Sequence, residues 1–331
     1  MEAHVQAAVV EIVQVVVVSY MGEKIIIATR GSKLALWQAN FVASLIRERY
    51  RGIQIELKRI KTSGDKILDV PLARIGGKGL FVKEIEECLL RGEADIAVHS
   101  MKDVPAQLPE GLEIAVIPPR EEPWDCLLSL SYPSLKDLPP QAQVGTSSLR
   151  RQAQLRALRP DIEIKMLRGN LDTRVRKLKQ GEFDAIVVAM AGLRRLGIVA
   201  PYMQKLCLPK FYPAVAQGAL GIEVSSENRR VKRLISPLQD PVSRICVEAE
   251  RGFLFEMEGG CQVPLGAHAH IEGEEVVISG FVGDVNGENI ISSTHRGAAS
   301  DPVAVGRSLA HYLLSRGGRE ILDKVYGGGE K

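Results

Sequence analysis

The sequence has few cysteines, and their pattern excludes two common uses of that residue. Five cysteines occur among 331 residues, and no two of them form a C-x-x-C pair. An odd number without such a pair argues against a disulfide framework and a zinc site, and it is typical of a reducing compartment. Of the six histidines, only His268 and His270 lie close together, and the sequence supplies no further ligands for them. We therefore expect no bound metal.

Long apolar runs are also missing. No stretch of about 18 uninterrupted apolar residues occurs, which excludes a membrane span. The first twenty residues are apolar, but they lack the basic start and the small-residue cleavage site of a signal peptide. We expect residues 1–21 to be an extension without ordered structure, because the strongly patterned sequence begins after Met21. Together with the cysteine pattern, this predicts a cytoplasmic protein.

The motifs of nucleotide binding are absent as well. The segment "RIGGKGLF" resembles a phosphate loop but lacks the G-x-x-x-x-G-K-[ST] spacing, and no G-x-G-x-x-G follows a predicted strand. A nucleotide ligand is therefore disfavoured. Gly76, Gly77 and Gly79, with the preceding "TSGDKILDVPLAR", instead indicate a mobile lid over a binding cleft.

Strands and helices alternate along the first two thirds of the chain. The pattern predicts strands over 24–30, 53–60 and 94–100, separated by helices over 33–50 and 80–92. The same order of elements returns between residues 142 and 190, and "RGEADIAV" is echoed by "QGEFDAIVV". Alternation of this kind predicts parallel sheets with helices on both faces. We predict two similar α/β domains, with limits 22–118 plus 219–236 for the first and 124–212 for the second.

The pattern changes in the last third of the chain. A helix over 242–257 leads into "EGGCQVPLG", and alternating strands with a hairpin at "VNGEN" and an amphipathic helix over 303–318 follow. This predicts a third, smaller α+β domain over 237–331. Its thiol, Cys261, lies at the turn from helix to strand between two glycines and a proline, a setting that leaves a side chain accessible.

Basic residues gather at the predicted carboxyl ends of the strands, where open α/β sheets bind ligands. Residues 146–179 contain ten Lys or Arg and only three acids, and no Phe, Tyr or Trp for base stacking. This composition disfavours single-stranded nucleic acid and favours several carboxylates, each bound by a guanidinium group. The candidate residues at these turns are Arg30, Ser32, Thr146, Ser148, Arg150, Arg151, Arg168 and Arg174.

One carboxylate stands among these cations. In "AVHSMKDVP" the strand ends near Ser100, so Lys102 and Asp103 project from the carboxyl edge of the first domain. His99, Ser100 and Asp103 are too close in one turn to form a catalytic triad, and we expect His99 to be structural. Asp103 could cap a turn, but among so many cations it is well placed to stabilise a developing positive charge.

Eight motifs in order resemble the porphobilinogen deaminase family, also called the hydroxymethylbilane synthases. They are "IATRGSKLALWQ", "GDKILDVPLARIGGKGLFVKE", "ADIAVHSMKDVP", "VGTSSLRRQAQL", "LRGNLDTR", "AGLRRLG", "PAVAQGALGIE" and "EGGCQVPLG", and they span nearly the whole chain from Lys24 to Tyr326. The sequence departs from the family pattern at Ala216, where glycine is usual, and at Trp124, where a small or charged residue is common.

The resemblance implies two lobes like those of type II periplasmic binding proteins, a third domain, and a monomeric enzyme. It implies that Cys261 carries a dipyrromethane cofactor through a thioether, and that Asp103 is catalytic as four porphobilinogen molecules are joined with loss of ammonia. It further implies cofactor contacts from Lys102, Thr146, Ser148, Arg150 and Arg151, and substrate contacts from Arg30, Ser32, Arg168, Arg174 and Arg195.

Two other classes of function fit part of the sequence. A non-catalytic carboxylate-binding protein would use the same two lobes, but it would give the third domain no role. A nucleic-acid binder would use the basic stretch without Asp103 or Cys261, and its binding would weaken steeply with salt.

Overall fold

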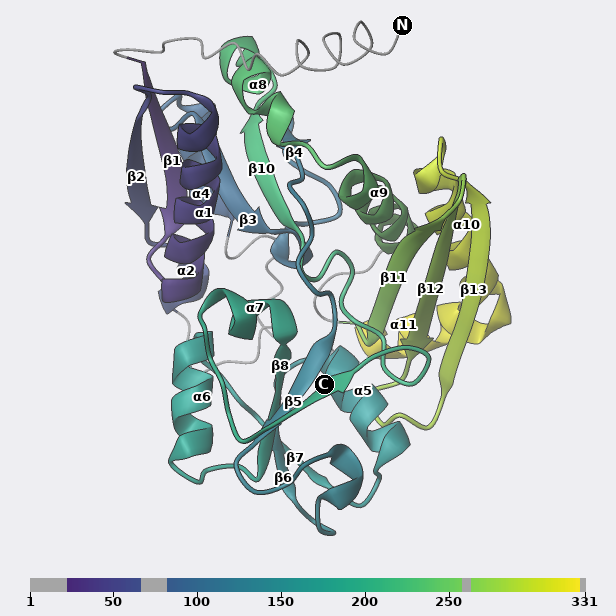
Figure 1. Cartoon of the computed structure of the whole chain (residues 1–331). Coiled ribbons are helices and arrows are strands. Elements are labelled where there is room, and N and C mark those ends of the chain that lie inside the picture. Colours follow the sequence, from purple (N-terminus) through teal and green to yellow (C-terminus); the bar gives the residue numbers. More distant parts are fainter. Residues whose placement is uncertain (1–22, 67–81, 258–262, 328–331) are drawn as a thin grey trace, which may run out of the picture.

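The computed structural model describes residues 23–66, 82–257 and 263–327, which form three sheets with their helices (Figure 1). The predictions made for residues 1–21, for the lid around Gly76 to Gly79 and for Cys261 lie outside the described residues. Among the described residues, no helix combines the length and the apolar character that crossing a bilayer would require.

The first lobe is a five-stranded sheet with helices on both faces. Ile25 and Ile27 of strand β1 (Lys24–Arg30) are fully buried against α1 (Lys33–Arg49) and α8 (Arg229–Ile235), and Ala28 of the same strand faces α4 (Lys83–Leu90) on the other side. Ser32 caps α1 by accepting the N–H of Ala35 at 3.3 Å. The strand order is β2 (Gln54–Ile60), β1 (Lys24–Arg30), β3 (Ile96–Ser100), β10 (Leu220–Ser225) and β4 (Leu112–Val116), and the short helix α2 (Ser63–Lys66) follows β2.

The second lobe repeats this arrangement. Leu155 of α5 packs on one face of the sheet, and α6 and α7 cover the other. The strand order is β7 (Glu163–Lys165), β6 (Gln143–Gly145), β8 (Ala185–Ala189), β5 (Asp125–Ser129) and β9 (Tyr202–Leu206), and the helices are α5 (Leu149–Leu158), α6 (Leu171–Lys179) and α7 (Met190–Arg195). The predicted pair of similar α/β lobes is therefore confirmed, while the predicted domain limits stay a prediction.

The sheets are parallel as predicted except for one strand in each lobe. β10 runs antiparallel to both of its neighbours, and so does β5. The strand register gives the reason. Asp125, the first residue of β5, pairs with Ala189, the last residue of β8, and Leu220, the first residue of β10, pairs with Ser100, the last residue of β3. The chain crosses between the lobes twice, and each time it enters the new sheet at the carboxyl ends of the parallel strands. The entering strand must therefore run antiparallel to them.

The third sheet is antiparallel, with the order β11 (Leu265–Glu272), β12 (Glu275–Gly283) and β13 (Ile290–Ala298). The predicted hairpin at "VNGEN" is confirmed, because Gly283 pairs with Ile290 across it. Helices α9 (Pro241–Glu256) and α10 (Pro302–Leu313) pack together on the sheet, and α11 (Arg319–Gly327) ends the described chain. Short turns complete the elements: η1 (Met101–Asp103), η2 (Leu135–Asp137), η3 (Ser236–Leu238) and η4 (Leu314–Gly318).

Both departures from the family pattern lie at the crossings. Ala216 has a φ of 57°, in the left-handed region where glycine is unstrained, which explains why glycine is usual there. The Trp124 ring contacts His268 edge-on, with ring centroids 4.7 Å apart, and Lys205 lies 5.6 Å from the Trp124 ring centroid. Trp124 therefore joins β9 of the second lobe to β11 of the third sheet.

Candidate active site

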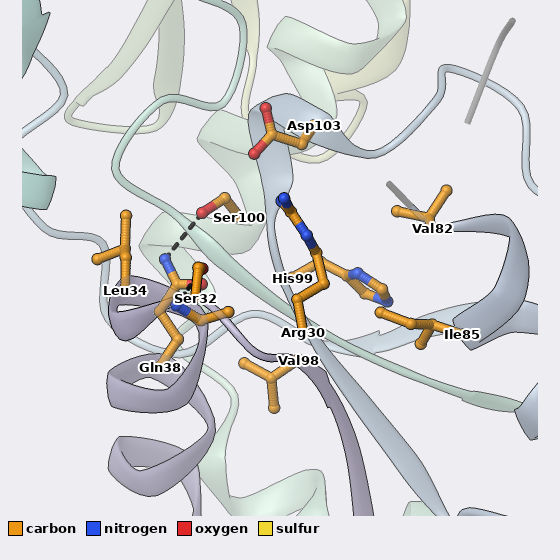
Figure 2. A pocket seen from close by; sticks show the side chains of 11 residues that line it. Arg30, Ser32, Leu34, Gln38, Val82, Ile85, Val98, His99, Ser100 and Asp103 are labelled. Carbon is orange, nitrogen blue, oxygen red and sulfur yellow. Dashed lines mark hydrogen bonds between the residues drawn. The ribbon is translucent and has the colours of Figure 1, made fainter. Parts of the chain in front are cut away.

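A small pocket of about 70 Å³ lies at the carboxyl edge of β1 and β3 (Figure 2). Arg30, Ser32 and Asp103 all line it, so three of the residues singled out in the sequence come together there. Figure 2 shows the Arg30 side chain extending from β1 toward the turn that carries Asp103. Gln38 of α1 closes one side by donating to the Ser100 hydroxyl at 2.8 Å.

Asp103 is held at the exposed end of a buried turn. In η1, the N–H of Met101 donates to Ala219 O at 3.0 Å, and the N–H of Val104 donates to Met101 O at 3.2 Å. Met101 and Val104 are 1% and 4% exposed, whereas the Asp103 side chain is exposed. Because the residues on either side of it are fixed by packing, the backbone that carries the carboxylate has a defined position at the edge of the pocket.

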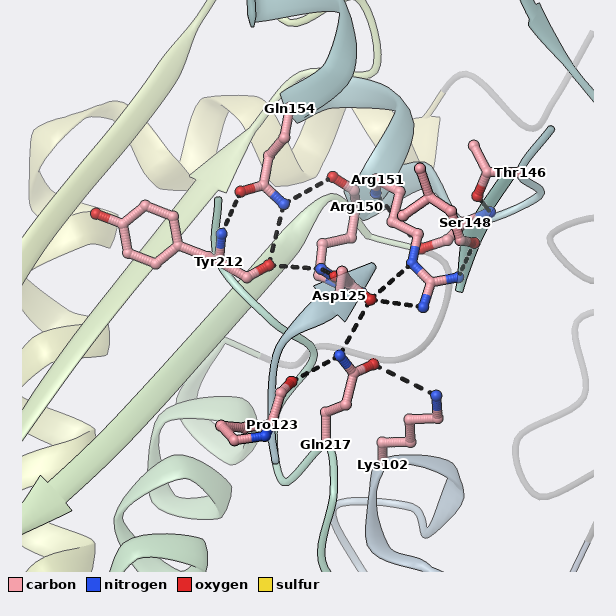
Figure 3. Close-up of polar contacts among 11 residues, drawn as sticks. Lys102, Pro123, Asp125, Thr146, Ser148, Arg150, Arg151, Gln154, Tyr212 and Gln217 are labelled. Atoms are coloured by element: carbon pink, nitrogen blue, oxygen red, sulfur yellow. Dashed lines mark hydrogen bonds and ion pairs between the residues drawn. The ribbon is translucent and has the colours of Figure 1, made fainter. Parts of the chain in front are cut away.

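Lys102 is not among the residues that line this pocket, and it belongs to a network that joins the two lobes (Figure 3). Its ammonium donates to Gln217 Oε1 at 3.3 Å, and Gln217 Nε2 donates to Asp125 Oδ1 at 3.0 Å. Loss of water around the Lys102 ammonium lowers its pKa to about 8; the Asp103 charge opposes this change and the Arg151 charge adds to it. The ammonium therefore lies within the electrostatic reach of Asp103 and of the second lobe's arginines.

Asp125 lies at the centre of this network. Arg150 Nη1 and Arg151 Nη2 each donate to the Asp125 carboxylate at 2.7 Å, and all three side chains are almost fully buried. Burial alone would raise the pKa of Asp125, but the two guanidinium groups hold it far below its usual range. Two cations share one anion, so the cluster keeps a positive charge.

Asp125 and Gln217 are not predicted from the sequence. The sequence predicts that Arg150 and Arg151 bind an external anion, whereas in the structure an internal carboxylate contacts both. The available signal was an acid at the start of the otherwise apolar strand "DCLLS", where a charge needs a partner.

Arg168 and Arg174 are different, since no acid contacts either among the described residues. Arg174 Nε donates to the backbone oxygen of Gly169 at 2.8 Å. Burial, with the nearby charges of Arg151 and Arg168, lowers the pKa of Arg174 to about 10, and the Asp103 charge opposes this. Arg168 Nε is buried without a hydrogen-bond partner in the described part of the chain. Within the described part of the chain, these two guanidinium groups therefore lack the internal carboxylate that Arg150 and Arg151 share.

Other predicted residues have contacts within the protein. Ser148 caps α5 by accepting the Arg151 N–H at 3.5 Å, and the buried Thr146 hydroxyl accepts the Ser148 N–H at 3.2 Å. Arg195 donates to Gly218 O at 2.6 Å and lies 5.8 Å from the Trp37 ring centroid, so it bridges the lobes. No hydrogen bond or ion pair described in the structure joins Arg195 to the Asp125 network.

His99 forms a buried pair beneath the Asp103 turn. His99 Nε2 lies 2.8 Å from Glu223 Oε2, and both side chains are buried. Burial and the Glu223 charge raise the pKa of the neighbouring Glu86 to about 7. The expected structural role of His99 agrees with this pairing.

These features define a class: a two-lobed α/β protein with a third, smaller domain, whose facing edges gather cations around one exposed carboxylate. Sequence comparison narrows the class. The sequence model described as "Porphobilinogen deaminase, dipyromethane cofactor binding domain" matches residues 25–233, and the one for the C-terminal domain of the same enzyme matches residues 244–315. The chain therefore belongs to the porphobilinogen deaminase family.

Individual relatives agree with this assignment. The chain is 59% identical over 303 residues to the porphobilinogen deaminase of Maridesulfovibrio salexigens, covering 92% of this chain and 98% of the relative. It is 49% identical over 300 residues to that of Geobacter sulfurreducens, covering 91% and 94%. The resemblance found in the sequence motifs is confirmed, and with it the assignment as a transferase of porphyrin biosynthesis with a dipyrromethane cofactor.

Solved structures with similar lobes share little sequence with this chain. The effector-binding domain of BenM with benzoate is 14% identical, with a TM-score of 0.41, over 66% of this chain and 91% of that one. YtmK of Bacillus subtilis, described as a probable amino-acid ABC transporter extracellular-binding protein, is 12% identical, with a TM-score of 0.39, over 65% of this chain and 90% of that one. At these TM-scores, neither likeness bears on the site.

Proposed function

We propose that Asp103 is the catalytic carboxylate, and Cys261 the attachment point of the cofactor, in the porphobilinogen deaminase reaction of this chain. In that reaction four porphobilinogen molecules are joined head to tail with loss of ammonia, and the linear tetrapyrrole is then released by hydrolysis. The observation that carries the proposal is the exposed Asp103 carboxylate, fixed by a buried turn and facing cations of both lobes.

The residues around Asp103 fit a ligand with several carboxylates. Arg168 has a buried Nε that lacks a partner among the described residues, and Arg174 contacts a backbone carbonyl rather than an acid. A carboxylate can accept two parallel N–H bonds from a guanidinium group, and such bonds are stronger where water is excluded. When bound, the cofactor supplies the pyrrole end to which substrate is added.

We assign the cofactor contacts to Lys102, Thr146, Ser148, Arg150 and Arg151. Asp125 holds the two arginines in place, and the positive charge that remains on the cluster favours an anion. The hydroxyl groups of Thr146 and Ser148 belong to the turn before α5, where free N–H groups also favour negative charge.

We assign the substrate contacts to Arg30, Ser32, Arg168, Arg174 and Arg195. Each porphobilinogen carries two carboxylates, so a growing chain needs several cations at different places. Arg30 and Ser32 belong to the first lobe, and the other three belong to the second. Arg195 would bind through the guanidinium nitrogens that Gly218 O leaves available.

The chemistry assigned to Asp103 follows from its charge. When the aminomethyl group of the substrate loses ammonia, positive charge develops on the pyrrole and its methylene carbon. An adjacent carboxylate stabilises that charge, and it can accept a proton from the pyrrole when the new carbon–carbon bond has formed. Lys102, with a pKa of about 8, stays largely protonated at neutral pH, and its positive charge lies within electrostatic reach of the carboxylate.

We further propose that the chain works as a cytoplasmic monomer on porphobilinogen, without nucleic acid. The family resemblance supports a monomer, and the odd number of cysteines supports a reducing compartment. The absence of aromatic residues from positions 146–179 argues against single-stranded nucleic acid. We also propose the domain limits 22–118 with 219–236, 124–212 and 237–331, which agree with the membership of the three sheets.

Replacement of Asp103 by asparagine tests the catalytic assignment. Asp103→Asn keeps the size of the side chain and removes its charge, so we expect a normal fold and a loss of turnover of about 100-fold to 10,000-fold. Asp137→Asn is the matched control, because Asp137 is also an exposed aspartate that ends a short 3₁₀ turn. Porphobilinogen consumption is measured for both variants.

A near-normal rate for Asp103→Asn would show that the carboxylate is misassigned. An equal loss in Asp137→Asn would show that the effect comes from the fold and not from chemistry.

A further inference from the structure

The Arg251 side chain of helix α9 binds the backbone that follows the Asp103 turn. Its Nη2 donates to Pro105 O at 2.8 Å and to Ala106 O at 3.1 Å, and its Nη1 donates to Val104 O at 3.4 Å. These three carbonyls belong to the residues directly after Asp103. One guanidinium group therefore fixes three consecutive peptide units next to the proposed catalytic carboxylate.

Apolar packing joins the same two elements. Met101 and Val104, on either side of Asp103, belong to one buried cluster with Phe253 of α9 and Met257, the residue that directly follows this helix. The chain beyond Met257 leads to Cys261, four residues later. The proposed catalytic carboxylate and the proposed cofactor attachment point are thus linked through the last turns of α9.

The environment of Arg251 indicates that it has a positioning role. Burial lowers its pKa, while the Glu223 charge opposes this change. Among the described residues it forms no ion pair within 4 Å, and its hydrogen bonds go to backbone oxygens instead. A guanidinium group that binds several carbonyls in a fixed pattern defines the geometry of a backbone more than it balances charge.

We propose that Arg251 is a positioning residue for the reaction: it fixes the Asp103 turn relative to the helix that leads to the cofactor-bearing cysteine. This inference rests on the roles proposed above for Asp103 and Cys261. Loss of the guanidinium group lets the turn shift against α9, so the carboxylate moves away from the place where the positive charge develops.

The same helix supplies a matched control, Arg244. It too is partly buried, and burial lowers its pKa. Its Nη1 donates to Ile114 O at 3.1 Å and its Nη2 to Ala115 O at 2.6 Å, so it also joins α9 to backbone carbonyls of the first lobe. Those carbonyls belong to β4 and not to the Asp103 turn.

The test compares Arg251→Gln and Arg244→Gln as fully loaded holoenzymes, with loading checked by denatured intact mass. Both variants lose carbonyl contacts, and we expect comparable falls in the urea midpoint. A displacement of about 1 Å at a reacting group can cost about 100-fold in rate. We therefore expect kcat to fall about 10-fold to 100-fold in Arg251→Gln, with KM for porphobilinogen within about twofold of wild type. In Arg244→Gln we expect kcat within about twofold of wild type, because the Asp103 turn keeps its contacts.

The conservative substitution gives a second readout. Arg251→Lys keeps the charge and can reach some of the three carbonyls, so its kcat should lie between those of wild type and Arg251→Gln. If Arg251→Gln does not fold, the comparison of Arg251→Lys with Arg244→Lys decides, and kcat must be lower in the former.

Equal kcat values for the Arg251 and Arg244 variants would overturn the inference, and so would a change confined to KM. If the wild-type holoenzyme itself leaves porphobilinogen unconsumed, the proposed function fails and this inference fails with it. An active wild type with an unimpaired Arg251→Gln overturns this inference alone.

Discussion

Replacement of Asp125 by asparagine should destabilise the second lobe strongly. Asp125 accepts hydrogen bonds from Arg150 Nη1 at 2.7 Å, from Arg151 Nε and Nη2 at 3.1 and 2.7 Å, and from Gln217 Nε2 at 3.0 Å. Asparagine removes the charge and turns an NH₂ group toward these donors. Removing one partner of a buried ion pair typically costs about 3–5 kcal/mol, because the remaining charge is left uncompensated. We expect Asp125→Asn to lose about that much free energy of unfolding.

The loss should be nearly independent of pH between pH 5 and pH 6. The folded-state pKa of Asp125 lies far below its usual value, so its contribution is fully present above the unfolded pKa of about 3.9. It disappears only as the pH falls through the folded-state pKa. The Asp125 charge also raises the pKa of Lys102, which is about 8, so both measurements are made well below that value. Urea unfolding of wild type and variant at pH 5 and pH 6 should therefore give the same difference.

Asp161→Asn is the control for this prediction. Asp161 also pairs with an arginine, since Arg159 Nη2 lies 2.7 Å from its Oδ2, but its side chain is 40% exposed. An exposed pair contributes little to stability, because water screens the two charges. A loss below about 1 kcal/mol in Asp125→Asn, no greater than that in Asp161→Asn, would refute the reasoning that burial makes Asp125 indispensable.

Three further predictions concern other parts of the molecule. Because burial raises the pKa of Glu86 from 4.5 to about 7, stability falls as the pH rises through this window. Glu86→Gln should therefore gain more stability at pH 8 than at pH 5, by up to about 3 kcal/mol in urea unfolding, and an equal gain at both would contradict this. Gly218 has a φ of 90°, and an added Cβ would lie 2.3 Å from Glu121 O. Gly218→Ala should therefore lose at least about 2 kcal/mol of unfolding free energy. An unchanged melting temperature would contradict the close contact between Gly218 and Glu121, where the two chain crossings meet. Burial raises the thiol pKa to about 12 at Cys126 and about 11 at Cys246, so iodoacetamide at pH 8 should leave both unmodified in peptide mass analysis of the native protein. Alkylation of either at the rate of an exposed thiol would contradict that prediction.

The sequence predicts the lobes well because local patterns determine them. The apolar run from Ile25 to Ile27 and the cap at Ser32 specify a strand and a helix start without any distant partner. The antiparallel strands β5 and β10 depend on where the chain crosses between lobes, and no local pattern records that. Their direction follows from the structure, in which β5 begins at Asp125 and β10 at Leu220, each beside the carboxyl end of a neighbouring strand.

The site is predicted in part for a similar reason. Cations at the ends of strands stand out in the sequence, and the structure brings Arg30 and Ser32 to one pocket with Asp103. The internal partners do not stand out, because Asp125 and Gln217 are far in sequence from the groups that they hold. Arg251 is another example, since its carbonyl partners lie about 145 residues earlier in the chain.

Denatured intact mass of the purified protein, wild type and Cys261→Ser, tests the central claim most directly. We predict that the wild-type chain is heavier than the bare polypeptide by the mass of a two-pyrrole group, and that Cys261→Ser has the mass of its polypeptide alone. A wild-type mass equal to the bare polypeptide, in a protein that leaves porphobilinogen unconsumed, would contradict the account.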